Sequence, residues 1–251
     1  MRKRRLRMLL AGCFAALLAA ATASAAHSME PDLQDQASLQ NGMKLYVNYC
    51  MGCHSLEYQR FSRAADDLGI PQDLARANLI FSSELAYNDQ MLTALESDDA
   101  KQWFGAVPPD LTLQARLRSP DWIYAFLLGF YQDASRPTGV NNTVSDLVAM
   151  PNVLEPLQGV QTLACAEVDG RDANALSAQG SSCEGLKITQ PGELAPAEFE
   201  QVVYDLTNFL VYVGEPSRLK AQALAPKVLI FIFIFVVMAY LLKREYWRDI
   251  H

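Results

Sequence analysis

Histidine and positive charge are both scarce in this sequence. Three of the 251 residues are histidine: His27, His54 and His251. They lie far apart, so a zinc finger or a histidine-rich metal centre has too few ligands. Acidic residues outnumber basic residues, 28 to 21, and the formal net charge is −7. This balance argues against nucleic-acid binding, and it suits either a basic partner protein or simple solubility.

The five residues Cys50-Met51-Gly52-Cys53-His54 carry the clearest chemical signal in the chain. Two thiols with a two-residue spacer and an adjacent histidine form the pattern that attaches a c-type haem. The thiols bond to the vinyl groups, and the imidazole becomes an axial ligand of the iron. A thioredoxin-like motif and half of a zinc site are the alternatives. The first would follow a strand, whereas residues 31–49 have helical spacing, and the second needs another ligand pair that the chain lacks.

Both ends of the chain have targeting features. Residues 1–25 combine a basic start, an apolar Ala-rich run and the small-residue site Ala23-Ser24-Ala25, which predicts a signal peptide. The uncharged run 228–242 is too short to cross a bilayer alone, but extension back past Lys227, which can snorkel, predicts an anchor over residues 221–243. The basic tail 244–251 then stays in the cytoplasm, and a haem domain of residues 26–220 lies outside.

A methionine is the expected sixth ligand, because no second histidine lies in the body of the chain. Met29 is terminal, Met43 lies on the motif helix, and Met238 lies in the apolar run. Met150, in a loop and followed by proline, fits better than Met91 and is predicted to bind the iron. The alternative for Met150 is a buried side chain that fills a gap in the core.

Three more residues are candidates for the haem domain. Cys165 and Cys183 lie in a polar, Gly- and Ser-rich segment, and export to an oxidising compartment predicts a disulfide between them. Arg116 lies on a short helix that follows Val107-Pro108-Pro109-Asp110-Leu111. A guanidinium is a suitable bidentate partner for a haem propionate, although an exposed arginine is the alternative.

The spacing of apolar residues predicts a mainly helical domain with long loops. Helices are expected over residues 31–49, 72–81, 87–96, 120–131 and 197–213, and loops over 135–158 and 185–196. The aromatic residues of 120–131 either line the haem crevice or pack in the core.

Several stretches together resemble the cytochrome c1 family. They are NGMKLYVNYCMGCHSLEYQRF, AVPPDLTLQARLR followed by DWIYAFLLGFY, AMPN, and the anchor ending in LLKREYW. The resemblance implies a class I cytochrome c-like domain with large loop insertions and one covalently attached haem c, held by Cys50, Cys53, His54 and Met150. It also implies that Arg116 contacts a propionate and that Cys165 pairs with Cys183. Residues 101–104, Lys-Gln-Trp-Phe, differ from the small and amide residues of mitochondrial members.

The family also implies a function and partners. The chain would pass single electrons from a Rieske-type iron–sulfur subunit to a cytochrome c, beside a cytochrome b subunit in a bacterial inner membrane, with the haem domain periplasmic. Isolated, the chain would not be an enzyme. The alternatives are a free-standing tethered shuttle, an oxidase subunit, or a haem peroxidase, which would need a distal acid–base residue without a spare histidine.

Overall fold

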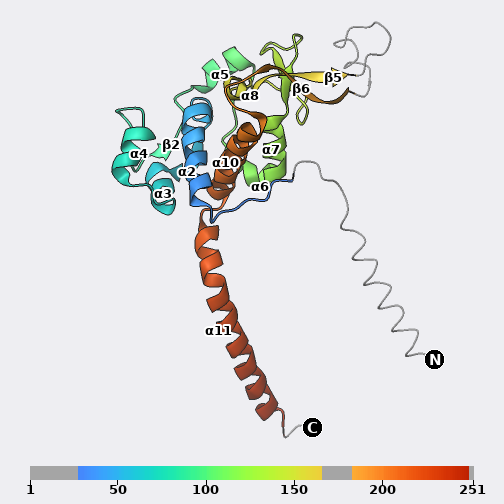
Figure 1. Cartoon of the computed structure of the whole chain (residues 1–251). Helices are drawn as coiled ribbons and strands as arrows, with labels where there is room; N and C mark the ends of the chain where they lie inside the picture. Colours follow the sequence, from blue (N-terminus) through green and yellow to red (C-terminus); the bar gives the residue numbers. More distant parts are fainter. Residues whose placement is uncertain (1–27, 166–182, 249–251) are drawn as a thin grey trace, which may run out of the picture.

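The computed structural model describes residues 28–165 and 183–248. They form a mainly helical domain from which one long C-terminal helix projects (Figure 1). The prediction of a mainly α fold with one apolar C-terminal helix is therefore confirmed. The signal peptide predicted for residues 1–25 lies outside the described residues.

Helices α2, α4 and α7 lie within predicted segments but are shorter, α10 and α11 extend slightly beyond theirs, and α3, α5 and α8 were not predicted. Helix α2 continues directly into a π-helical turn that ends on the first cysteine of the motif. The bounds are α2 Gln36–Leu45, the π-helical turn Tyr46–Cys50, α3 Phe61–Asp67, α4 Gln72–Asn78, α5 Ser97–Phe104, α6 Gln114–Arg118, α7 Pro120–Leu128, α8 Glu155–Gln158, α10 Pro196–Gly214 and α11 Ser217–Tyr246.

The described strands form three small antiparallel pairs. β1 (Leu56–Arg60) pairs with β2 (Gln90–Met91), β3 (Phe130–Gln132) with β4 (Val140–Asn142), and β5 (Gly159–Cys165) with β6 (Cys183–Pro191). Three predictions were wrong here. Residues 87–96 contain β2 rather than a helix, residues 185–196 contain most of β6 rather than a loop, and the predicted loop 135–158 contains β4 and α8. Strands β2 and β6 are each defined by pairing with a segment distant in sequence, which local periodicity does not show.

The core lies where α2 crosses α10. A Cβ atom at Gly42 would lie 2.6 Å from Cβ of Phe209 and still closer to the backbone oxygen of Asp205, so the two helices touch at this glycine. Beside the contact, Asn41 Nδ2 donates to Asp205 Oδ2 over 2.7 Å. The inner face of α10 is buried, as its spacing predicted, through Phe199, Val203, Leu206, Phe209, Leu210 and Val213. The helix that carries the motif is thereby fixed against the longest helix of the domain.

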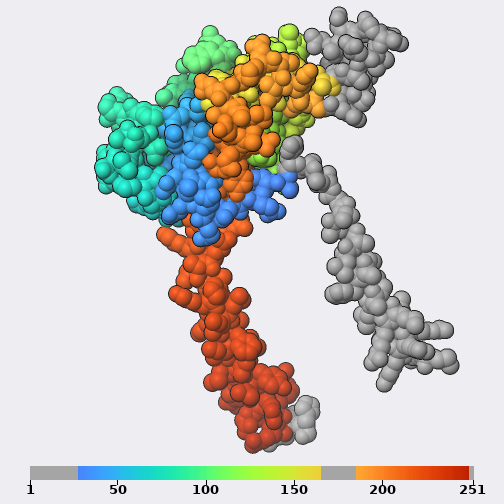
Figure 2. All heavy atoms as spheres, in the orientation of Figure 1, coloured from blue at the N-terminus to red at the C-terminus, as the bar shows by residue number. Residues whose placement is uncertain are grey.

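Helix α11 leaves the domain after a short break at Glu215 and Pro216. Its 30 residues span about 45 Å at ~1.5 Å per residue, more than the roughly 30 Å of a hydrocarbon layer. In the described part of the chain it is the one helix long and apolar enough to cross a membrane, and none of its apolar window is buried. Figure 2 shows it projecting away from the rest of the molecule.

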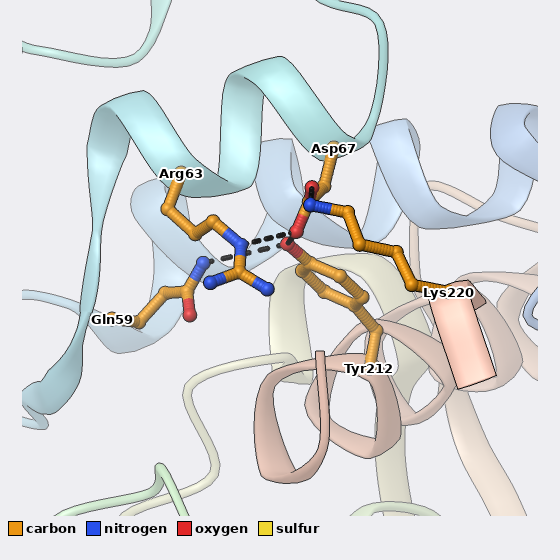
Figure 3. Close-up of polar contacts among 5 residues, drawn as sticks. All are labelled: Gln59, Arg63, Asp67, Tyr212 and Lys220. Atoms are coloured by element: carbon orange, nitrogen blue, oxygen red, sulfur yellow. Dashed lines mark hydrogen bonds and ion pairs between the residues drawn. The ribbon is translucent and has the colours of Figure 1, made fainter. Parts of the chain in front are cut away.

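A polar cluster joins the first turn of α11 to the domain (Figure 3). The Asp67 carboxylate, with a side chain only 11% exposed, accepts from Arg63 and from the hydroxyl of Tyr212, and lies 3.7 Å from Nζ of Lys220. Gln59 Nε2 donates to the same Tyr212 hydroxyl over 3.5 Å. Three helices, α3, α10 and α11, therefore meet at one carboxylate.

Candidate functional site

The motif cysteines lie on a tight turn at the end of α2. The backbone nitrogens of Cys53 and His54 both donate to the oxygen of Cys50, over 3.0 and 2.9 Å. Cys50 is buried and Cys53 half-buried. Burial, with the neighbouring Cys53 thiol, raises the pKa of Cys50 to about 12. Thioredoxin-like cysteines have lowered pKa values, so the Cys50 environment is unlike that of a redox-active thiol.

The His54 ring is held by a backbone carbonyl. Its Nδ1 lies 2.8 Å from the oxygen of Pro109. A carbonyl only accepts hydrogen bonds, so Nδ1 carries the proton and Nε2 keeps its lone pair for a metal. Burial lowers the pKa of His54, although the Pro109 contact acts against it, and the imidazole is therefore neutral at pH 7. From the other side, the hydroxyl of Tyr46 donates to the His54 backbone oxygen over 2.6 Å.

An apolar cavity of about 340 Å³ lies against the motif. Its volume lies within the range of about 300–1,000 Å³ that is typical of cofactor pockets. The wall includes both motif thiols and His54, and apolar side chains of α7 and α10, among them Trp122, Phe126, Leu206 and Leu210. Trp122 and Phe126 stack with ring centroids 5.0 Å apart. Aromatic residues of α7 therefore line the cavity, which was one of the two sequence interpretations.

The cavity also separates the candidate methionines. Met150 lines it, on the loop between β4 and α8. Met43 and Met91 are fully buried in the core and do not line it. The structure thus brings Met150, which the sequence selected by a separate argument, to the same cavity as the motif residues Cys50, Cys53 and His54.

The structure does not bring Arg116 to the cavity. The Arg116 side chain is exposed, and its stem packs beside Gly214 at the end of α10. Arg118 lines the cavity instead, with its guanidinium 5.0 Å from the ring centroid of Trp122. Between α6 and α7, Ser119 has a φ of 84°, which turns the chain sharply directly after Arg118.

Other parts of the cavity wall were not predicted from the sequence. They include Tyr49, Phe104 and Gln114. Phe104 ends α5, and its neighbour Trp103 is 65% exposed. Among residues 28–165 and 183–248, no group of three or more His, Cys, Asp or Glu side chains is arranged to hold a metal ion directly.

Cys165 and Cys183 lie opposite one another at the far end of the β5–β6 hairpin. Directly opposed Cα atoms in an antiparallel pair are about 4.5–5.5 Å apart, a separation that a disulfide can bridge. The backbone register therefore permits the predicted pairing.

The family model of the Cytochrome C1 family matches residues 26–161 and 190–250. Among curated relatives, the chain is 46% identical to cytochrome c1 of Allochromatium vinosum, over 94% of each chain. It is 41% identical to a protein of Nitrosomonas europaea named ammonia monooxygenase gamma subunit, over 88% of this chain and 86% of the relative. It is 25% identical to cytochrome c1 of Rhodospirillum rubrum, over 86% and 83%.

Proposed function

This chain belongs to the cytochrome c1 family, and from that premise we propose that it is the membrane-anchored haem subunit of a quinol–cytochrome c reductase. It would accept single electrons from a Rieske-type iron–sulfur subunit and pass them to a cytochrome c. The observation that carries the proposal is the cavity in which two thiols, a neutral imidazole and a methionine meet. On its own the chain would not be an enzyme, because electron transfer needs no side-chain acid or base.

The residues of the cavity fit one covalently attached haem c. Cys50 and Cys53 would hold it by thioether bonds, and His54 and Met150 would ligate its iron. The hydrogen bond from Nδ1 of His54 to Pro109 fixes the ring orientation and leaves Nε2 for the iron. When bound, the group would supply a single one-electron centre. The apolar side chains of α7 and α10 exclude water from it, and a low-polarity surrounding with a thioether ligand favours a high reduction potential.

Arg118 is the better candidate for a propionate partner. It lines the cavity, whereas Arg116 packs beside Gly214. Arg118→Gln and Arg116→Gln form a matched pair on one short helix. We expect the first to lower the midpoint reduction potential, because loss of the cation leaves the negative charge of the propionate uncompensated, and this charge favours the oxidised iron. The second should leave the potential unchanged. Equal shifts, or a shift only in the Arg116 variant, would contradict this assignment.

The remaining predictions extend the proposal to topology and the hairpin. With α11 as anchor and basic residues after it, the haem domain lies in the periplasm of a bacterial inner membrane and the tail in the cytoplasm. Cys165 and Cys183 would form a disulfide that closes the hairpin. Alkylation of the unreduced, denatured protein should then leave both thiols unmodified. Labelling of either would refute the bridge.

Two experiments test the function. After extraction of the membrane with a mild detergent, the chain should co-purify with a cytochrome b and an iron–sulfur protein. Recovery as a lone haem protein would favour a tethered shuttle, and recovery with an ammonia monooxygenase would assign it to another complex. Met150→Leu should abolish the near-infrared sulfur-to-iron charge-transfer band of the oxidised protein. If that band survives, Met150 is not the ligand.

A further inference from the structure

Two carbonyls at the C-terminal end of α7 accept hydrogen bonds from side-chain amides. The last carbonyls of a helix lack the usual donor four residues on. In this chain Phe126 O accepts from the backbone nitrogen of Gly129 and from one side-chain amide, and Leu128 O accepts from two side-chain amides. The same helix forms a wall of the cavity. Side chains that donate to the C-terminal carbonyls of α7 are therefore held in place relative to the cavity.

Asn142 bonds the start of the Met150 loop to this helix end. The residue is 2% exposed, and its Nδ2 donates to Phe126 O over 2.7 Å. Its Oδ1 accepts from the backbone nitrogens of Val144 and Ser145, at 2.9 and 3.3 Å. One amide side chain thus joins the first residues of the loop to α7.

Gln158 does the same at the other end of the loop. It is 4% exposed, and its Nε2 lies 3.3 Å from Leu128 O, to which it donates. Its Oε1 accepts from Nδ2 of Asn152, two residues after Met150, over 3.1 Å. The Oδ1 of Asn152 accepts in turn from the Leu154 backbone nitrogen. Met150 is therefore flanked on both sides by contacts that lead to one helix end.

We propose that Asn142 and Gln158 are positioning residues that hold the Met150 sulfur toward the iron. The inference rests on the proposed function, because it takes Met150 as the axial ligand. The loop itself has no regular structure between β4 and α8, so its own backbone hydrogen bonds do not determine where the sulfur lies. Replacement of a residue that orients a metal ligand, without itself touching the metal, commonly weakens the binding of the metal.

Gln161 provides a matched control. Its Nε2 donates to the same Leu128 O, over 3.0 Å, and to Phe130 O over 2.9 Å, but no hydrogen bond joins it to Asn152. Gln158→Leu and Gln161→Leu each remove one of two amides from one carbonyl. Only Gln158→Leu also removes the partner of the Met150 loop.

The test uses the full haem-loaded chain in detergent, with imidazole as a probe that competes with methionine for the oxidised iron. For Gln158→Leu we expect a weaker charge-transfer band and about tenfold tighter imidazole binding, because a hydrogen bond that orders the loop is lost. Gln161→Leu should match the wild-type protein in both. Asn152→Ala removes the same loop contact from the other side and should repeat the Gln158→Leu result, in case that variant folds poorly.

Equal imidazole affinities in all variants, or the same change in Gln158→Leu and Gln161→Leu, would overturn the inference. A wild-type protein without the band would instead refute methionine ligation, and with it that part of the proposed function. The two failures are therefore distinguishable.

Discussion

Replacement of Gly42 by alanine tests whether the contact between α2 and α10 is as close as the structure shows. Helix propensity alone predicts a gain, because alanine in a helix interior is about 1 kcal/mol better than glycine. The structure predicts the opposite sign. The new methyl group would meet the Phe209 Cβ atom at 2.6 Å and, closer still, the Asp205 backbone oxygen. Neither is the end of a flexible side chain, so one helix must move.

The size of the effect follows from these two terms. Overpacking of a core costs up to about 3 kcal/mol, and a collision with helix backbone belongs at the upper end of that range. After subtraction of the propensity gain, we expect the free energy of unfolding to fall by about 2 kcal/mol. For a domain of this size that is a drop of about 4–8 °C in Tm.

Thermal unfolding of the haem-loaded chain, followed by circular dichroism, measures the change. Ala37→Gly is the control, since Ala37 is exposed in the first turn of the same helix and its replacement should lose at most about 1 kcal/mol through propensity. A Gly42→Ala protein with a Tm at or above that of the wild type would show that α2 and α10 are not in backbone contact.

Two further predictions concern polar contacts. Tyr46→Phe should lower the free energy of unfolding by about 1–3 kcal/mol, because a buried carbonyl of the motif histidine loses its donor; a chemical denaturation curve measures this, and an unchanged midpoint would contradict it. Lys220→Met should change global stability by less than ~1 kcal/mol, since that lysine is exposed, whereas Asp67→Asn should cost more because Arg63 and Tyr212 also bond to that carboxylate. Equal losses in the two variants would argue against the shared carboxylate.

Features that depend on local spacing could be predicted from the sequence. Cys50, Cys53 and His54 are neighbours in the chain, so their proximity follows from covalent geometry. The apolar faces of α2 and α10 were visible in the three- and four-residue spacing, and the uncharged run predicted α11. Met150 was selected by elimination, and the structure places it at the cavity, while its role as a ligand stays a prediction.

Features that depend on a distant partner could not be predicted in this way. The choice between Arg116 and Arg118 depends on the neighbours that the fold gives them, because Arg116 packs beside Gly214 of α10 whereas Arg118 lies over the ring of Trp122 in α7. The β5–β6 hairpin lies in a polar segment without clear alternation, and its strands exist because they pair with each other across residues 166–182. Gln158 gave no local signal, because both of its partners lie on other elements.

The cluster around Asp67 joins α11 to α10, the helix that forms one wall of the cavity. Helix α10 packs against the motif helix and is followed at once by α11, and the carboxylate bridges the break between them. A bilayer that is thinner than the apolar span makes such a helix tilt. Because Asp67 joins the first turn of α11 to α3 and α10, a change in the tilt of α11 would act first on these two helices, of which α10 lines the cavity.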